Sequence, residues 1–192
     1  MVTAAAALDE GTSSLNDTYN CTSAGIQVLG QTYHCHSTPH GHIDFSEALV
    51  KSCNPALIQI GQTLGAGSFL RYFDSFGYTQ TTGSDVLGER DGIYHESLTP
   101  VDLATASFGQ NMKISMLQNI RALSAIANGG YLVSPYVVDS VTDKDGNIVT
   151  QTETNIRRQV ISEEVSRQLL SMMENNVHGE GNYLSLIHIS EP

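Results

Sequence analysis

The chain has 192 residues, which is enough for one domain with a buried core. Its 20 acidic and 9 basic residues give a formal charge of −11, and the basic residues are scattered along the sequence. This balance argues against a nucleic-acid groove and against a polybasic membrane-surface patch, because both need clustered Lys and Arg. No run approaches the roughly 18–20 apolar residues of a membrane span, and the first residues lack the basic segment of a signal peptide.

The first predicted element is a helix over residues 2–10, which is rich in Ala and is ended by Gly11. A helix that opens at Met1 has no N-cap, so we expect this helix to begin upstream of that residue. Residues 11–41 are polar and rich in turn residues, which predicts a loop with a small hairpin around residues 25–29.

Two helices are predicted to meet at residues 51–54. Asp44 and Glu47 have the spacing of a capping box, which predicts a short helix from residue 45 to about residue 51. Asn54 followed by Pro55 predicts a second helix, with Asn54 as its N-cap and Pro55 in its first turn. Gly65 is expected to end this second helix.

The rest of the chain is mainly helical in pattern. Further helices are predicted over residues 68–76, 99–107, 115–128 and 162–176. In the third of these, Leu117, Ile120 and Leu123 recur at three-residue steps, which predicts an apolar face at these positions. A hairpin is predicted between residues 136 and 150, with its turn at residues 143–146. Helices with one such hairpin indicate the α+β class.

Residues 183–192 fit no periodic pattern with the sequence before them. They look like a translated transposase-adapter sequence from a sequencing library, and we expect them to be a non-native tail. A genuine apolar tail is the alternative. The predicted domain therefore covers residues 1–182.

Ser52-Cys53-Asn54, at the predicted junction of two helices, is the first candidate site. Side chains at the first and third positions can project together into a cleft, where a hydroxyl relays a proton and a carboxamide donates and accepts hydrogen bonds. The structural alternative is that Ser52 only terminates one helix and Asn54 only caps the next. Lys51 is not expected to act as a base for Ser52, because neighbours on a helix point about 100° apart.

A second candidate is a group of thiols and imidazoles, formed by Cys21, His34, Cys35, His36, His40 and His42. A zinc site with two Cys and two His is chemically possible, although no close Cys pair is present to nucleate it. A Cys21–Cys35 disulfide is a second possibility, and free thiols are a third. Since the chain has three cysteines, at least one has no intramolecular partner, which excludes a disulfide framework.

The sequence around Ser52 resembles the second motif region of the class B penicillin-binding proteins. Three further stretches are also typical of that family, and the resemblance runs from Met1 to about Gly181. The four stretches are FSEALVKSCNPALIQIG (45–61), LTPVDLATASFGQ (98–110), SMLQ (115–118) and NGGY (128–131). The resemblance implies the fold shared by penicillin-binding transpeptidases and serine β-lactamases, of which this chain would hold the helical part and a hairpin.

The family uses three motifs, S-x-x-K, S-x-N and K-[ST]-G. Only the second is found here, at Ser52 and Asn54, because none of the three lysines has Ser three positions earlier or Ser/Thr-Gly directly after it. By the family pattern, S-x-x-K would directly precede Met1 and K-[ST]-G would follow residues 174–181. The chain is therefore expected to be an internal fragment without the nucleophile and the base, and to be catalytically inactive.

The resemblance implies that the parent protein cross-links peptidoglycan by serine D,D-transpeptidation of D-Ala-D-Ala stem peptides. Ser52 would shuttle a proton of the absent Lys, and Asn54 would hold the amide of the substrate or of a β-lactam. The expected partners are stem peptides, β-lactams and other cell-wall synthesis proteins, with no nucleic acid, cofactor or metal. The parent would act on the extracytoplasmic face of a bacterial membrane, through an anchor outside this chain. That oxidising setting favours the Cys21–Cys35 disulfide.

Two other functions remain open at this point. One is a β-lactamase or β-lactam sensor of the same fold, in which the same acylation has a different outcome. The other is a non-catalytic metal-binding module built on the Cys/His group.

Overall fold

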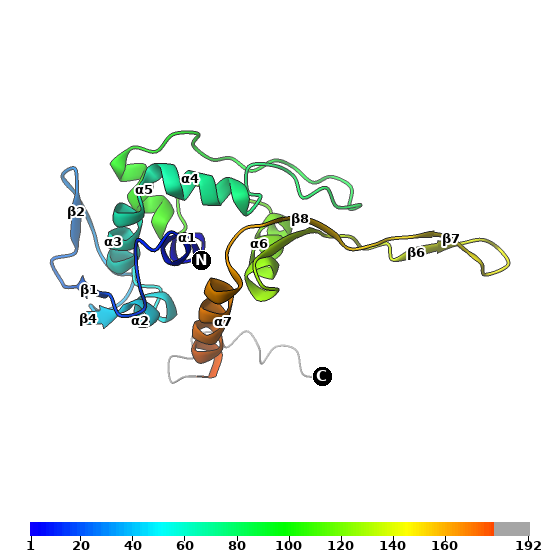
Figure 1. The fold of residues 1–192 in the computed structure, drawn as a ribbon. Coiled ribbons are helices and arrows are strands. Elements are labelled where there is room, and N and C mark those ends of the chain that lie inside the picture. Colours follow the sequence, from blue (N-terminus) through cyan, green and yellow to red (C-terminus); the bar gives the residue numbers. More distant parts are fainter. Residues whose placement is uncertain (179–192) are drawn as a thin grey trace.

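The structure, a computed structural model, describes residues 1–178 (Figure 1). The helices are α1 (Val2–Asp9), α2 (Phe45–Val50), α3 (Asn54–Leu64), α4 (Ala66–Ser75), α5 (Pro100–Ser107), α6 (Met116–Ala127) and α7 (Glu163–His178). The strands are β1 (Thr18–Cys21), β2 (Ile26–Val28), β3 (Gln31–Tyr33), β4 (Gly41–Asp44), β5 (Tyr131–Ser134), β6 (Ser140–Thr142), β7 (Ile148–Gln151) and β8 (Asn155–Gln159). This content confirms the α+β class. The predicted tail, residues 183–192, and the predicted end at residue 182 lie outside the described residues.

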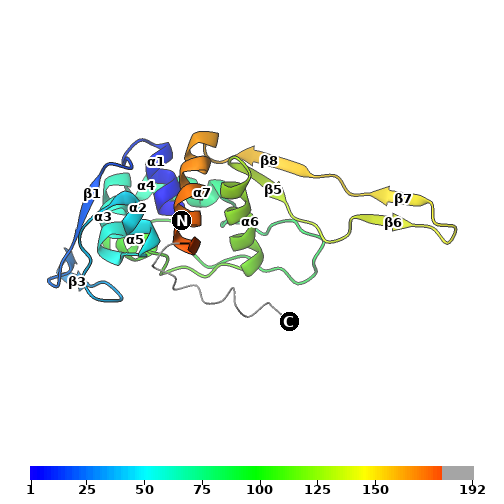
Figure 2. The ribbon, with the colours of Figure 1, turned by 90° about the horizontal axis from the view of Figure 1, so that it is seen from below.

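Helix α1 lies at the centre of the helical part, where it packs on α3, α4 and α7 (Figure 2). Residues 4–7 are four alanines, and all of them are fully buried. A helix that is apolar on every side is stable only when other elements surround it, and methyl side chains allow those elements to approach closely. Glu10 caps its C-terminus and Gly11 follows with a φ of 66°, as predicted. Within residues 1–178, no helix combines the length and hydrophobicity needed to cross a bilayer.

Side-chain caps define the starts of several helices. The predicted capping box of Asp44 and Glu47 is present at α2. At α5, Thr99 is the N-cap and forms a capping box with Asp102. The predicted cap of α3 is wrong by one residue, because Cys53 is the N-cap and Asn54 is already helical. Cys53 adopts the extended backbone of a cap without a side-chain hydrogen bond to the helix. The start of α3 is therefore stabilised by contacts other than a side-chain cap.

The helix predicted at α6 is confirmed, but its predicted apolar face is only partly correct, since Leu123 packs against the core. Ile120 is 57% exposed, whereas Gln118 and Arg121 are buried with Ala122, Ala125 and Ile126. The two polar side chains are buried because their amide and guanidinium groups donate to backbone carbonyls of residues 77–82. A hydrophobicity pattern cannot detect a buried face whose polar side chains find such partners, even though Arg121 Nε stays without one among the described residues.

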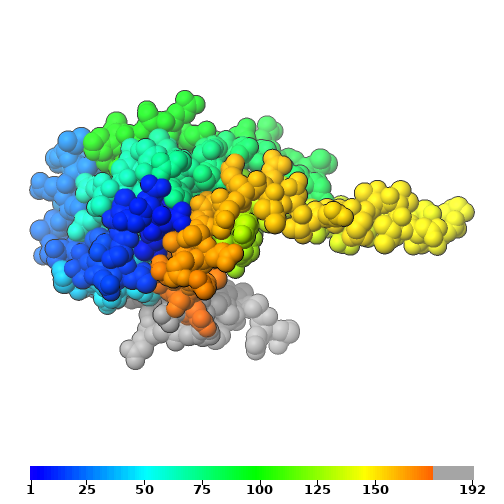
Figure 3. Space-filling model, in the orientation of Figure 1, coloured from blue at the N-terminus to red at the C-terminus, as the bar shows by residue number. Residues whose placement is uncertain are grey.

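The strands pair as four antiparallel two-stranded sheets within the described residues. The hairpins β2–β3 and β6–β7 lie where the sequence predicts hairpins. The pairs β1–β4 and β5–β8 were not predicted, because each joins segments with 19 or more residues between them. Sheet β5–β8 continues into β6–β7 as a narrow arm that leaves the helical body (Figure 3).

Candidate active site at the junction of α2 and α3

Ser52 connects α2 to α3 in a left-handed backbone conformation, with a φ of 48°. Its N–H donates to the carbonyl of Leu49 at 3.1 Å, and the N–H of Cys53 donates to the carbonyl of Ala48 at 2.9 Å. These two bonds complete the C-terminal turn of α2. A residue other than glycine is strained in this conformation by about 1–2 kcal/mol, and such strain is concentrated at functional sites.

A cavity of about 520 Å³ lies beside Ser52. Its wall comes from the first turn of α1, the end of α2, helices α3, α4 and α6, and the segment after α5. Most of the lining is apolar, with Leu57, Phe69, Phe73 and Leu123 among its side chains. The volume is within the range of about 300–1,000 Å³ that is usual for small-molecule sites.

Ser52 supplies an available hydroxyl at this cavity. The other hydroxyls in the wall already donate elsewhere. Thr3 donates to the carbonyl of Ser107 at 2.7 Å, Ser107 to the carbonyl of Leu103 at 2.6 Å, and Tyr78 to Asn119 Oδ1 at 3.1 Å. Burial raises the pKa of the Tyr78 phenol to about 12, so this group stays protonated. The hydroxyl of Ser52 makes no hydrogen bond to any other described residue, which leaves it free for a ligand.

Asn54 is half-buried in the first turn of α3. Its side-chain Nδ2 donates to the carbonyl of His34 at 3.3 Å, and the residue is not among those that line the cavity beside Ser52. The side chains of Ser52 and Asn54 therefore contact different parts of the molecule. The shared cleft expected for them is not formed among the described residues, because Ser52 lines the cavity whereas Asn54 is bonded to the carbonyl of His34.

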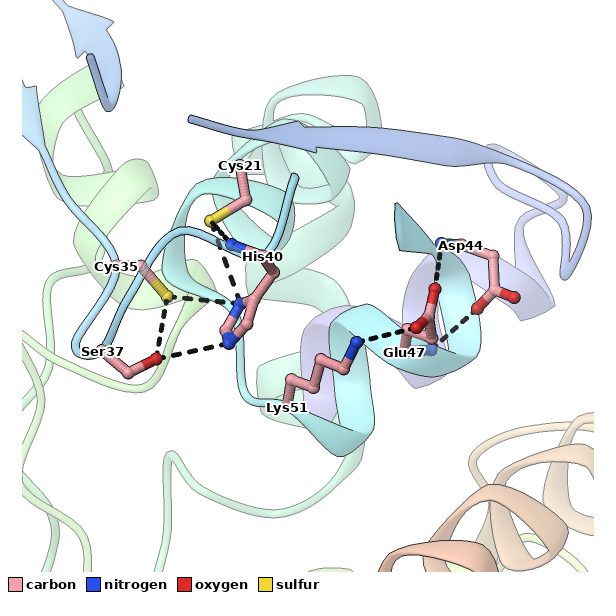
Figure 4. Close-up of polar contacts among 7 residues, drawn as sticks. All are labelled: Cys21, Cys35, Ser37, His40, Asp44, Glu47 and Lys51. Carbon is pink, nitrogen blue, oxygen red and sulfur yellow. Dashed lines mark hydrogen bonds and ion pairs between the residues drawn. The ribbon is translucent and has the colours of Figure 1, made fainter. Parts of the chain in front are cut away.

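Lys51 is not placed to act as a base for Ser52. Its Nζ lies 2.7 Å from Glu47 Oε1, one turn back along α2 (Figure 4). The hydrogen bond from Lys51 is also the main reason why the pKa of the Glu47 carboxyl is lowered. The structure therefore agrees with the exclusion of Lys51 as a base.

Three thiols and one imidazole converge behind this junction. Cys21 ends β1, Cys35 follows β3, His40 precedes β4, and Cys53 caps α3 (Figure 4 shows the first three). One sulfur or nitrogen atom from each residue lies within 4.8 Å of all the others. The three cysteines are free, so the predicted Cys21–Cys35 disulfide is not present in the structure.

This cluster differs from the sequence prediction in its membership. His34, His36 and His42 are not among the four residues, and His42 Nδ1 instead lies 2.9 Å from Asn20 Oδ1. Cys53 was not predicted as a member, because only the fold brings α3 beside the end of β1. The signal that the sequence offered was a third cysteine at a helix start shortly after the histidines.

The surroundings of the cluster control its protonation. Burial raises the pKa of the Cys53 thiol to about 12, and burial lowers the pKa of the His40 imidazole. Burial also acts to raise the pKa of Cys35, but hydrogen bonds from the backbone of Ser37 and from other groups outweigh it, so this pKa is lowered. Without a cation, the cluster thus combines a neutral imidazole with thiols of unequal acidity. Such groups can bind a soft metal ion or oxidise to a disulfide.

The chain matches a family model over residues 1–189, and this family is described as the penicillin binding protein transpeptidase domain. Stage V sporulation protein D of Bacillus subtilis (strain 168) is 35% identical over 184 residues, which cover 92% of this chain and 28% of that protein. Penicillin-binding protein PbpB of Mycolicibacterium smegmatis is 29% identical and is covered to the same extent, also 28%. The chain thus spans less than a third of these relatives. The match includes residues 183–189, so a non-native tail stays a prediction.

The fold agrees with solved structures of the same family. Penicillin-binding protein A from M. tuberculosis, in a ceftriaxone acyl-enzyme complex, superimposes with a TM-score of 0.79 at 26% identity. The superposition covers 91% of this chain and 40% of that structure. Together with the match over residues 1–189, this similarity establishes that the chain belongs to the penicillin-binding protein transpeptidase family.

Proposed function

We propose that this chain is the S-x-N-bearing part of a serine D,D-transpeptidase that cross-links peptidoglycan. The observation that carries the proposal is the family match over residues 1–189. Ser52, with a free hydroxyl at a cavity of about 520 Å³, supports it. The nucleophilic Ser and the base Lys of S-x-x-K are absent from the 192 residues, so segments outside the chain supply them in the parent protein.

In the parent, the nucleophilic serine attacks the carbonyl of the D-Ala-D-Ala bond, and the terminal D-Ala leaves as a free amine. The acyl group then passes to the amine of a neighbouring stem peptide, which frees the serine. Ser52 accepts a hydrogen bond from the catalytic Lys and relays a proton toward the leaving nitrogen. Because the described residues form no cleft that Asn54 shares with Ser52, Asn54 can hold the amide of the substrate only after its own Nδ2 leaves the carbonyl of His34, to which it is bonded at 3.3 Å.

The same chemistry accounts for β-lactam binding. The M. tuberculosis relative forms an acyl-enzyme with ceftriaxone. A β-lactam presents a strained amide at the position of the D-Ala-D-Ala bond, so the parent of this chain binds β-lactams and stem peptides at one site. Its place is the extracytoplasmic face of a bacterial membrane, together with other cell-wall synthesis proteins. It is held there by an anchor outside this chain.

A fluorescent penicillin tests both parts of the proposal. The 192-residue chain is expected to stay unlabelled, because neither nucleophile nor base is encoded in it. The parent, expressed from the longer reading frame, is expected to be labelled at a serine outside these residues. Covalent labelling of the 192-residue chain, or an unlabelled parent, would refute the proposal.

Variants of the parent test the roles of Ser52 and Asn54. Ser52→Ala and Asn54→Ala should slow acylation by about 10²–10⁴-fold, the usual contribution of a proton-transfer or positioning group. Ser46→Ala, the same kind of change within α2, is the control and should leave the rate unchanged. Continuous turnover of the penicillin, instead of a stable acyl-enzyme, would identify a β-lactamase relative.

A further inference from the structure

The cluster of Cys21, Cys35, His40 and Cys53 has the composition and spacing of a metal centre. Cys35 Sγ lies 3.6 Å from His40 Nδ1, and Cys21 Sγ lies 3.9 Å from the same nitrogen. In a tetrahedron with Zn–S bonds of about 2.3 Å and Zn–N bonds of about 2.0 Å, neighbouring ligand atoms are about 3.5–3.8 Å apart. These two distances already match a zinc tetrahedron, and since all four atoms lie within 4.8 Å of one another, shifts of at most about 1 Å bring the rest to ligand spacing.

The fold holds these residues together independently of any bond between them. Strand β1 pairs with β4 so that Cys21 lies opposite Gly41, and this register places the adjacent His40 beside Cys21. Cys53 reaches the same point from α3, where it occupies the N-cap position without making a side-chain cap bond. Both Cys21 and Cys53 are fully buried. Separate parts of the backbone thus deliver the ligand atoms to one point.

Hydrogen bonds around the cluster orient the imidazole. His40 Nε2 lies 3.3 Å from Ser37 Oγ, and the two thiols Cys21 and Cys35 lie on the side of Nδ1. A hydrogen bond from Nε2–H to Ser37 leaves the lone pair of Nδ1 directed at the thiols, as in the outer contacts of metal-binding histidines. The backbone N–H of His40 also donates to Cys21 Sγ at 3.4 Å, which holds that sulfur beside the imidazole.

We propose that Cys21, Cys35, His40 and Cys53 bind a structural Zn²⁺ ion. Three thiolates and one imidazole complete a tetrahedral shell, which leaves no position for a substrate or water, as in structural zinc sites. The thiol protons leave to solvent when the ion binds, and no oxidant or reductant is required. Because Cys53 stands between Ser52 and Asn54, the ion fixes the S-x-N motif to the β1–β4 sheet. The proposal does not rest on transpeptidase activity.

The test is the metal content of the 192-residue chain, purified with a thiol reductant and supplied zinc. Inductively coupled plasma mass spectrometry should detect about one Zn²⁺ per chain. The cysteines should be unreactive to a thiol reagent until a mercurial releases the ion. Replacement by Co²⁺ should give the intense sulfur-to-cobalt absorption of tetrahedral thiolate coordination. All three readouts use the wild-type chain and so do not depend on whether a variant folds.

Matched variants identify the ligands. His40→Ala and Cys53→Ser should lose stoichiometric zinc, while His42→Ala, two residues from His40 and outside the cluster, should retain it. His40→Cys should also retain zinc, since four thiolates form a common structural site. The proposal is overturned if the wild-type chain holds no zinc and its thiols react freely. It is also overturned if the reduced, zinc-supplied chain contains a Cys21–Cys35 disulfide, or if His40→Ala binds zinc as the wild type does.

Discussion

Gly61 lies where α3 and α5 approach each other. A β-carbon at this position would overlap Ser107 Oγ and lie 2.7 Å from Ser107 Cβ. Ser107 cannot turn aside freely, because its hydroxyl donates to the carbonyl of Leu103 and its own carbonyl accepts a bond from Thr3. The absence of a side chain at Gly61 is therefore a condition for the packing of these two helices.

We predict that Gly61→Ala lowers the free energy of unfolding by about 1–3 kcal/mol, the usual effect of overpacking a core. Alanine is the better helix former by about 1 kcal/mol, so a loss of stability would show that the contact decides the outcome. Gly67→Ala in α4 is the matched control, because no atom lies within 4 Å of its added β-carbon. Urea unfolding followed by circular dichroism measures both, and equal stability of the two variants would contradict the prediction.

At the scale of elements, helix α6 organises the segment of residues 77–82 through buried polar side chains. Arg121 is only 5% exposed, and its guanidinium donates to the carbonyls of Gly77 and Thr82. Gln118 donates to the carbonyl of Gln80 at 2.8 Å. Burial lowers the pKa of Arg121, yet the group stays charged because its ordinary pKa is far above neutrality. The segment thus depends on α6 for its hydrogen bonds.

Arg121→Met should lower the free energy of unfolding by about 2–3 kcal/mol. Methionine keeps an unbranched stem for packing, so the loss would come mainly from two buried carbonyls left without donors. The control is Ile120→Ala on the exposed side of the same helix, which should change stability by less than about 0.5 kcal/mol. Thermal unfolding compares the variants, and a Met variant as stable as the control would show that the guanidinium bonds are dispensable.

The elements that the sequence predicted well are those with local signals. The capping box at Asp44 joins residues three positions apart, so the sequence alone specifies it. The pairing of β1 with β4 and the arrival of Cys53 beside Cys21 depend on tertiary packing, which no local pattern encodes. At Ser52 the motif was recognised, but its left-handed backbone was not. The bond from Asn54 to the carbonyl of His34, 20 residues earlier, was missed as well, because it depends on tertiary packing.

At the scale of the whole molecule, the arm formed by β6 and β7 stands apart from the helical body (Figures 1 and 3). All the residues of these two strands are exposed. The base of the arm is attached separately, since the Asp85 carboxylate accepts hydrogen bonds from the N–H groups of Val137 and Val138. The outer arm therefore adds length to the molecule without adding to its core.

Replacing residues 140–151 by a two-glycine turn should change the free energy of unfolding by less than about 0.5 kcal/mol. The same replacement of residues 26–33 should be clearly destabilising, because Val28 in β2 is buried against Ile58 and Ala104. Calorimetric midpoints of the two deletions provide the comparison. A large loss on removing the outer arm would contradict the prediction, because it would show that the arm stabilises the helical body.

The alanines of α1 have a consequence for motion. A buried methyl group has no rotamers to choose from, so these four positions lose no side-chain entropy on folding and cannot repack when a neighbour shifts. When a helix on one side of α1 is displaced, the alanines cannot absorb the shift by changing rotamer, so α1 itself must move. We therefore expect α1 to move as a rigid body when a helix that packs on it is displaced.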